Sequence, residues 1–417
     1  MSELSYLEKL LDGVEVEWLP LSKVFNLRNG YTPSKTKKEF WANGDIPWFR
    51  MDDIRENGRI LGNSLQKISS CAVKGGKLFP ENSILISTSA TIGEHALITV
   101  PHLANQRFTC LALKESYADC FDIKFLFYYC FSLAEWCQKN TTMSSFASVD
   151  MDGFKKFLIP RPCPDNPEKS LAIQSEIVRI LDTFSALTAE LTAELTAELN
   201  MRKKQYNYYR DQLLSFKEGE VEWKTLGDVT KKWYSGGTPT AGKIEYYENG
   251  NIPWLRTQEV KFSEIDSTEI KITQAALKNS SAKWIPRNCV IIAISGATAG
   301  RSAINKIPLT TNQHCGCLEI DDTKALYRYV FHWVSFNYEN IKSLGQGARG
   351  DLNSTIIKNF KLPIPHASDP QKSLKEQARI VEILDKFDTL TNSITEGLPR
   401  EIELRQKQYE YYRDLLF

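Results

Sequence analysis

The sequence predicts an α+β protein in which two mixed α/β domains are joined by two long antiparallel helices that form a coiled coil. Two observations predict this fold class. The two halves of the 417-residue chain carry the same sequence matches in the same order, and each half ends in a long segment with apolar residues at helical spacing. Because duplication produces two similar units, we expect a pseudo-twofold internal repeat.

The internal repeat extends over nearly the whole chain. In the first part of each half, NGDIPWFR at 43–50 returns as NGNIPWLR at 249–256. In the second part, the KSL motif at 169–171 returns at 372–374, and KKQYNYYRDQLLSF at 203–216 resembles the closing residues QKQYEYYRDLLF. The matches of the second part keep a constant spacing, so both copies have equal length there. A tandem duplication accounts for so many ordered matches.

The opening residues resemble the end of a repeat. Leu10-Leu11 precede VEVEW just as Leu213-Leu214 precede the EVEW of the second copy. We therefore expect residues 1–13 to form a helix that completes the C-terminal repeat, which gives the repeats a circular arrangement. The other expected segments are a first mixed domain at 14–165, a central long helix at 166–217, a second mixed domain at 218–368 and a C-terminal long helix at 369–417.

Each mixed domain shows the patterns of buried strands and aromatic-rich helices. The short apolar runs Ser83–Ser87 and Cys289–Ala293 lie between Gly, Pro and Asn residues, as buried strands do. Helices are expected near Lys124–Gln138 and Leu326–Tyr338, where aromatic residues fall at helical spacing. We interpret these aromatics as core side chains, with a base-stacking platform as the alternative.

The long segments contain few helix-breaking residues. No Pro or Gly occurs from Glu168 to Leu214, whereas the segment from Lys372 to Leu416 contains Gly397 and Pro399. An interior proline removes a backbone hydrogen bond, so we expect a break or kink there. An apolar stripe this long needs a partner, and we expect the two segments to pack antiparallel. The residues expected to pack are Ile177, Leu181, Phe184, Leu187, Leu191, Leu195, Leu199, Ile380, Leu384 and Phe387.

A tetrapeptide, TAEL, occurs three times in succession at 188–199. Its residues favour helix, and its four-residue period departs from the 3.5 residues of a coiled coil. One unit lengthens a helix by roughly 6 Å and rotates the succeeding residues by about 40°. B-DNA rises about 3.4 Å and turns about 35° per base pair. A spacer of this kind would adjust the distance between two DNA-binding domains in steps comparable to base pairs.

Bulk composition bounds the class of protein. The chain has 42% hydrophobic and 25% charged residues, as globular proteins do. It has no run of about 18 apolar residues and no signal-peptide pattern, and its nine cysteines lack framework spacing. We therefore expect a cytoplasmic protein with reduced thiols and no membrane partner. The net charge of +1 leaves two interpretations open: no nucleic acid is bound, or the positive charge is local and partners share the phosphate contacts.

These features resemble one family, the specificity subunits of type I restriction-modification enzymes, in the subgroup where tetrapeptide repeats set a spacer. The motifs that carry the resemblance are the TAEL repeats, KSL…IVRILD and KSL…IVEILD, and the KQY-x-YYRD ends. The resemblance implies two target-recognition domains that read the parts of an asymmetric, bipartite double-stranded DNA target. It also implies docking of two methyltransferase subunits and of restriction subunits. It implies no catalytic residue, cofactor or metal in this chain.

Basic residues near turns are the first candidates for DNA contacts. Lys35, Lys37 and Lys38 follow the first Thr-Pro, and Lys231 and Lys232 precede the second Gly-Gly-Thr-Pro loop. Lysine and arginine contact phosphates and base edges. A solvated charged face is the alternative interpretation for each cluster.

Two arginines recur at the same place in both copies, Arg50 and Arg256. Because the two domains should read different sequences, a shared arginine is expected to hold phosphate or structure. Likewise, Asn105-Gln106 and Asn312-Gln313 are interpreted as structural turn residues.

Base contacts are expected where the copies differ, as they do in the loops at 142–148 and 346–351. The candidates there are Ser145, Gln346 and Arg349. Glycines beside Arg349 permit close backbone approach, which makes it the foremost candidate. The alternative is an arginine that is salt-bridged within its loop.

Other functions find less support. Neither a Gly-rich adenosylmethionine loop nor an Asn/Asp-Pro-Pro-aromatic tetrapeptide occurs, and no acidic or nucleophilic cluster recurs in both copies. The stretch 237–243 has phosphate-loop spacing, but Ile244 stands where Ser or Thr should hold magnesium. His314, Cys315 and Cys317 lack the paired spacing of zinc modules, so buried free cysteines are expected. A structural adaptor that binds no DNA is the alternative function.

Overall fold

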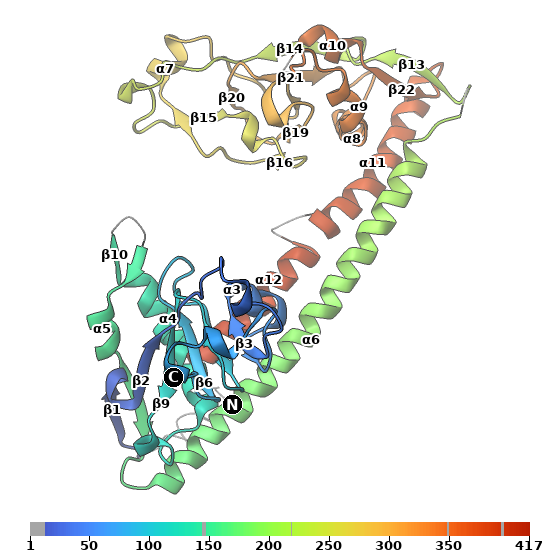
Figure 1. The fold of residues 1–417 in the computed structure, drawn as a ribbon. Coiled ribbons are helices and arrows are strands. Elements are labelled where there is room, and N and C mark those ends of the chain that lie inside the picture. The colour runs from blue at the N-terminus through green and yellow to red at the C-terminus, as the bar shows by residue number, and fades with distance from the viewer. Residues whose placement is uncertain (1–12, 144–146, 218, 348–349, 393–395) are drawn as a thin grey trace. The chain divides into compact units, whose positions relative to one another are not determined.

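The computed structural model describes residues 13–143, 147–217, 219–347, 350–392 and 396–417 (Figure 1). Within the chain, contacts define two compact units. Unit 1 contains Met1–Ala193 and Leu404–Phe417, and unit 2 contains Glu194–Glu403. Each unit therefore combines one mixed domain with parts of both long helical segments. The helix expected at 1–13 falls on residues that lie, except for Gly13, outside the described part of the chain.

Unit 1 is built on a five-stranded sheet with the order β2-β9-β6-β7-β4. Neighbouring strands are antiparallel, except that β4 and β7 run parallel. Helix α4 (Ile123–Lys139) packs against β6 and β7. The strands of this sheet are β2 (Phe25–Asn29), β4 (Ile60–Leu61), β6 (Ser83–Ser87), β7 (His95–Ile98) and β9 (Phe108–Leu113).

Smaller elements complete unit 1. Strand β3 (Ile46–Phe49) pairs antiparallel with β5 (Lys67–Ile68) and parallel with β8 (Leu103–Ala104). Two further ribbons are antiparallel. They consist of β1 (Val16–Pro20) with β12 (Leu158–Pro162), and of β10 (Thr141–Met143) with β11 (Ala147–Val149). The short helices are α2 (Leu21–Val24), α3 (Met51–Asn57) and α5 (Met151–Lys156).

Unit 2 repeats this topology. Its five-stranded sheet has the order β14-β21-β18-β19-β16, and its three-stranded sheet has the order β17-β15-β20. The strands are β13 (Val221–Thr225), β14 (Thr230–Ser235), β15 (Ile252–Leu255), β16 (Glu264–Ile265), β17 (Lys271–Ile272), β18 (Val290–Ala293), β19 (Ser302–Asn305), β20 (Thr310–Thr311), β21 (Cys315–Ile320) and β22 (Lys361–Pro365), which pairs with β13. The helices are α7 (Gln274–Lys278), α8 (Tyr327–Phe336), α9 (Tyr338–Ser343) and α10 (Ser354–Asn359). The duplication in sequence is therefore a duplication in fold.

The predicted strands and helices of the mixed domains are confirmed. Every residue of β6 and β18 is buried, as expected for short apolar runs. Helices α4 and α8 lie where aromatic residues recur at helical spacing, and their aromatic side chains belong to the cores. Phe125 and Tyr128 are 2% and 3% exposed, and Tyr329 is 0% exposed. These rings therefore fill the interior, and the base-stacking alternative for them is excluded.

The long helical segments form as predicted. Helix α6 (Pro167–Leu213) is continuous over 47 residues, about 70 Å at 1.5 Å per residue. The second segment consists of α11 (Pro370–Asn392) and α12 (Leu398–Asp414), so the break expected at Gly397 and Pro399 is confirmed. No helix of the described residues has both the length and the apolar character needed to cross a membrane.

The two long helical segments pack antiparallel to each other. In unit 1, Phe184 of α6 packs against Tyr412 of α12 with ring centroids 5.7 Å apart. In unit 2, Tyr209 of α6 stacks on Phe387 of α11 at 5.5 Å. As the residue number rises along α6, the number of its partner falls, which is the signature of antiparallel packing.

The residues expected to pack between helices divide into two groups. Ile177 and Leu181 are buried in the core of unit 1, and Ile380 and Leu384 are buried in the core of unit 2, so these side chains hold a helix to its own mixed domain. Within the TAEL region, Leu191, Leu195 and Leu199 are partly buried. Leu187 departs from the expectation, since it exposes 50% of its surface. A four-residue period drifts about 40° per repeat around a helix, so all the leucines cannot stay on one face.

A buried polar joint fixes each mixed domain to its long helix. In unit 1, Gln174 of α6 is 0% exposed; its carbonyl accepts from the backbone N–H of Asp122, and its amide donates to Cys120 O and Ser170 Oγ. Gln377 of α11 makes the equivalent bonds in unit 2, with Leu326, Lys324 and Ser373. The serines are those of the two KSL motifs, which explains why this motif occurs at both helix starts.

Candidate nucleic-acid interface

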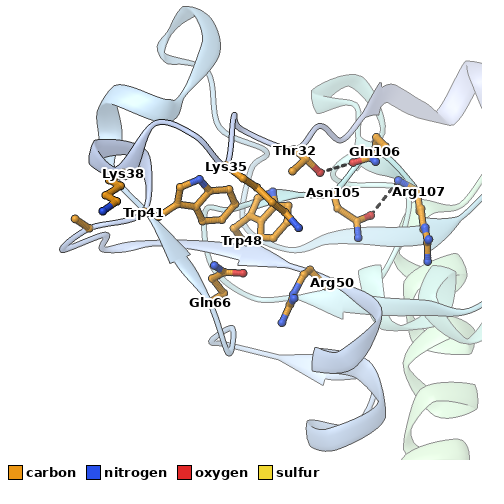
Figure 2. A pocket seen from close by; sticks show the side chains of 11 residues that line it. Thr32, Lys35, Lys38, Trp41, Trp48, Arg50, Gln66, Asn105, Gln106 and Arg107 are labelled. Atoms are coloured by element: carbon orange, nitrogen blue, oxygen red, sulfur yellow. Dashed lines mark hydrogen bonds between the residues drawn. The ribbon is translucent and has the colours of Figure 1, made fainter.

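Three of the predicted DNA contacts lie together in unit 1, on the wall of a cleft of about 750 Å³. These residues are Lys35, Lys38 and Arg50. Figure 2 shows Lys38 and Trp41 toward one end of the cleft and Gln106 and Arg107 toward the other. The cleft is lined by Thr32, Lys35, Lys38, Trp41, Ala42, Trp48, Arg50, Gln66, Asn105, Gln106 and Arg107.

Two tryptophans shape the loop that carries the lysines. Trp48 on β3 is 3% exposed, and its indole N–H donates to Tyr31 O at 3.0 Å. Trp41 meets Trp48 edge to face, with ring centroids 5.0 Å apart, and its own indole N–H donates to Ser34 O at 3.0 Å. These contacts hold both ends of the loop, so Lys35 and Lys38 project from a fixed backbone.

The turn between β8 and β9 forms another wall of the cleft. Asn105 Oδ1 accepts a hydrogen bond from the backbone N–H of Arg107 at 3.0 Å, and the Thr32 hydroxyl donates to Gln106 Oε1. The prediction of a structural turn at Asn105-Gln106 is confirmed, and Gln106 also lines the cleft. Gly30 lies against this turn; a Cβ there would be 2.1 Å from Asn105 O, so only glycine fits.

The two shared arginines have different surroundings. The guanidinium of Arg256 forms ion pairs with Glu259, at 3.5 Å, and with Glu269, which agrees with a structural role. Arg50 is 3.5 Å from Asp52 and lines the cleft. Among the described residues, the buried Nε of each of the two arginines has no hydrogen-bond partner. Within the described part of the chain, Arg50 therefore has one acidic partner where Arg256 has two, and its side chain lies at the wall of the cleft.

The remaining predicted lysines lie outside the residues that line the cleft. Lys37 Nζ lies over the Phe40 ring at 5.0 Å, and Lys243 makes the same contact with Tyr246 at 4.9 Å. Because both copies have it, we assign this cation–π contact to the shared scaffold.

Lys231 and Lys232 lie on β14, an edge strand of the five-stranded sheet. Lys231 is 3.3 Å from Glu319, and Lys232 lies over the Tyr234 ring at 4.8 Å. The hydroxyl of Tyr234 donates to Glu319, and this bond together with Lys231 lowers the pKa of that carboxyl. These two lysines are therefore already partnered within the unit.

The two copies differ in the loops at 142–148 and 346–351, and each of these regions contains a hairpin. The hairpin of unit 1 lies beside the cleft, and that of unit 2 lies beside the equivalent turn at Asn312-Gln313. In unit 1 the hairpin is β10–β11; in unit 2, Gln346 and Asp351 exchange backbone hydrogen bonds at 2.9 Å. Ser145 and Arg349, the candidates predicted in these loops, lie outside the described residues. Gln346 is exposed at the base of its hairpin.

One backbone residue joins hairpin and turn in each unit. In unit 1, Thr88 N–H donates to Arg107 O at 2.9 Å, and Thr88 O accepts from Val149 N–H at 3.0 Å. In unit 2, Ile294 makes the same two bonds, with His314 O at 2.9 Å and Leu352 N–H at 2.8 Å. The hairpin and the turn are thus neighbours on the same side of each unit.

Sequence reasoning missed four cleft residues, Trp41, Ala42, Gln66 and Arg107. A signal was present for Arg107, because it follows the repeated Asn-Gln and is replaced by His314 in the second copy. Gln66 gave no such signal, since only the pairing of β3 with β5 brings it beside Trp48, whose backbone N–H donates to Gln66 O at 3.1 Å.

Among the described residues, His314 and the cysteines beside it belong to no group of three or more side chains that could hold a metal ion. Cys315 and Cys317 are buried in β21, and burial raises the pKa of the Cys315 thiol to about 12 and that of Cys317 well above its usual range. His314 pairs through Nδ1 with the hydroxyl of Ser295 at 2.7 Å. The prediction of buried free cysteines is confirmed.

Comparisons with known proteins identify the family. The family described as type I restriction modification DNA specificity domain matches the chain twice, at residues 13–201 and 218–404. The EcoprrI type I specificity subunit of Escherichia coli is 65% identical over 398 residues, covering 95% of this chain and 93% of that protein. The EcoR124I/EcoR124II specificity subunit of Escherichia coli is 45% identical over 441 residues, covering 100% and 98%.

A solved structure has the same fold. It comes from a study of complex assembly and conformational transition of the type I R-M system, and it aligns with a TM-score of 0.61 at 15% identity, covering 96% of this chain and 97% of that chain. The duplicated sheets, the two helical segments and the double family match agree with one another. The chain therefore belongs to the family of type I restriction-modification DNA specificity domains.

Proposed function

We propose that the chain is the DNA-recognition subunit of a type I restriction-modification complex, and that each unit reads one part of an asymmetric, bipartite double-stranded target. One observation carries this proposal: the two units have the same backbone arrangement at the turn and the hairpin, but different exposed side chains on it. Both units hold an equivalent turn and hairpin through the same backbone bonds, yet the exposed residues on them differ. Such a pair of domains suits a target with two unlike halves.

The cleft of unit 1 has the chemistry of a DNA contact. Lys35, Lys38, Arg50 and Arg107 bring four cationic side chains to its wall, and none of the lining residues is acidic. Cations of this kind hold phosphates and donate to base edges. Local positive charge of this type also reconciles DNA binding with the net charge of +1.

The hairpins extend this proposed interface. Gln346 in unit 2 is a candidate for a base contact, because its hairpin adjoins the turn equivalent to that of the unit 1 cleft. Ser145 and Arg349, which lie outside the described residues, are candidates because the two copies differ in sequence at these loops. Lys37, Lys231, Lys232 and Arg256 have partners within the protein, so we assign them at most contacts with phosphate.

We further propose that two methyltransferase subunits dock on the chain and that restriction subunits join them, with catalysis in those partners. The support is a pair of exposed tryptophans at equivalent places. Trp18 on β1 is 49% exposed and Trp223 on β13 is 48% exposed, each on a two-stranded ribbon. Exposed tryptophan is enriched at protein interfaces, and one such residue per copy suits two copies of one partner.

Fluorescence anisotropy with the assembled methyltransferase complex and a duplex that carries its methylation target tests the function. We expect specific binding, and a weaker complex when Lys35, Lys38 and Arg107 are changed together to Ala. Lys23→Ala is the matched control, because Lys23 is exposed before β2, whereas the cleft lies beyond the other end of this strand. An adaptor that binds no DNA would leave the anisotropy unchanged with every variant, and this result would refute the function.

A further inference from the structure

The two units present one scaffold with different side chains around the tryptophan. Trp254 in unit 2 repeats the contacts of Trp48: its indole N–H donates to Gly237 O at 3.1 Å, and its backbone N–H donates to Ile270 O at 3.1 Å, as that of Trp48 does to Gln66 O. Thr238 bonds to Gln313 as Thr32 does to Gln106. Residues 32–44 and 238–250 align without a gap, so each position has a direct counterpart.

Lys38 and Ile244 occupy the same position in this scaffold. Each opens a short 3₁₀ turn, Lys38–Phe40 or Ile244–Tyr246. The preceding residue has nearly the same backbone in both, with φ −89° and ψ 94° at Lys37 and φ −80° and ψ 98° at Lys243. The two side chains therefore leave the backbone in the same direction, and the Lys38 side chain lines the cleft.

At this position unit 1 has the charged side chain of Lys38, and unit 2 has the apolar side chain of Ile244. Ile244 exposes 71% of its surface, although burying an isoleucine side chain gains about 1.5–3 kcal/mol. The neighbouring counterparts change in the same sense: Lys35 becomes Ala241, and Gln66 becomes Ile270. Unit 1 thus offers hydrogen-bond donors where unit 2 offers methyl groups.

A phosphate contact does not explain this exchange. Every half-site has the same phosphates, so a residue that holds them is expected in both copies. A position that differs between the copies on an otherwise equal backbone is expected to read bases. In the major groove, lysine donates to guanine O6 and N7, whereas an apolar side chain packs against the C5-methyl of thymine.

We infer that Lys38 and Ile244 are the equivalent specificity-determining residues of the two half-sites: Lys38 contacts a guanine, and Ile244 contacts the methyl group of a thymine. This inference rests on the proposed function, because it requires that both units bind DNA through this face. It assigns the recognition of a DNA base to one structurally equivalent position in each unit.

Methylation-motif mapping of the assembled complex tests the inference. The complex methylates a randomised duplex library, and sequencing gives the preference at each position of both half-sites. For Lys38→Ile we expect preference for a G·C pair at one position of one half-site to fall about tenfold to hundredfold, the range of one base contact. For Ile244→Lys we expect a comparable loss for a T·A pair in the other half-site. Lys23→Ile is the control for the same exchange and should leave both half-sites unchanged.

Each other outcome overturns a stated part of the account. Unchanged motifs in both variants, or uniformly weaker methylation with unchanged motifs, would refute base reading by this position, since the second result indicates a phosphate contact. A wild-type complex without a bipartite motif would instead refute the proposed function. Lys38→Met keeps the length of the side chain, so it yields the same readout if Lys38→Ile fails to fold; thermal melting separates the two cases.

Discussion

The side-chain carbonyl of Gln174 accepts a hydrogen bond from the backbone N–H of Asp122 at 2.9 Å, which ties the start of α4 to α6. The same relationship joins Gln377 and Leu326 in unit 2. A mixed domain that is bonded to the start of its long helix must follow the orientation of that helix. These joints therefore supply the rigidity that a DNA-reading domain on a helical spacer requires.

Replacement of Gln174 by Ala should loosen this joint. The change leaves the partly buried N–H of Asp122 and carbonyl of Cys120 without their partner, at about 1–3 kcal/mol for each group at most. We expect the free energy of unfolding to fall by about 2–4 kcal/mol, measured by urea denaturation followed by circular dichroism. Gln212→Ala, at an exposed site of the same helix, serves as control. A Gln174→Ala protein as stable as this control would contradict the role of the joint.

The stability of unit 1 should depend on pH through His95. This residue is fully buried, and burial, aided by Arg59, lowers its pKa from 6.5 to about 3. Between pH 6.5 and pH 3, His95 is therefore protonated in the unfolded chain but neutral in the folded unit. The free energy of unfolding consequently falls as the pH falls from 6.5 toward 3. The expected slope is about 1.4 kcal/mol per pH unit for one proton.

Denaturation of the wild type and of His95→Phe across this pH range tests the prediction. Phenylalanine fits a site that already packs edge to face against Phe127 and Phe131. Because His102, with a pKa lowered by burial to about 4, contributes in the same direction, the variant should show a reduced slope and not a flat one. Identical slopes in both proteins would exclude His95 as the source.

Gly30→Ala should distort the cleft. The new methyl group would lie 2.1 Å from Asn105 O and 2.4 Å from Ala104 O, both backbone atoms that cannot move without shifting the turn. We expect lower stability and at least tenfold weaker binding of target DNA by the assembled complex, measured by anisotropy. Gly62→Ala is the control, because its methyl group would meet only the Thr99 hydroxyl at 3.3 Å. Equal affinity in both variants would show that the turn plays no part in DNA binding.

Deletion of Thr196–Leu199 should change the spacer of the target and leave both half-sites intact. The deletion removes one turn-sized unit, roughly 6 Å and 40°, from α6 and touches neither mixed domain. Methylome sequencing of a host that carries the system reads both quantities at once. An altered half-site, or an unaltered spacer with retained activity, would contradict the spacer role of the TAEL repeats.

Much of the fold could be predicted from the sequence, because duplication and helical periodicity are local signals. The break at Gly397 and Pro399 and the buried aromatics of α4 followed from residue type and spacing alone. Leu187 did not, since the phase of a four-residue repeat depends on where the partner helix lies.

The candidate site was less predictable. Lys35 and Lys38 were found as a charge cluster, but Trp41, Gln66 and Arg107 join them only through pairing of strands that are distant in sequence. Lys231 and Lys232 looked equivalent in the sequence, yet they lie on the edge strand β14 and pair with Glu319 and Tyr234. Charge alone does not distinguish a lysine that is partnered within its sheet from one that lines a cleft.

Mapping the methylation motif of the wild-type complex tests the central claim most directly, that two units with one scaffold and different exposed side chains read two unlike half-sites. Single-molecule sequencing of genomic DNA from a host that carries the complete system gives this motif. The account predicts an interrupted motif whose two halves differ in sequence and are separated by a fixed number of unspecified bases. A continuous motif, two identical halves, or methylation without sequence preference would contradict it.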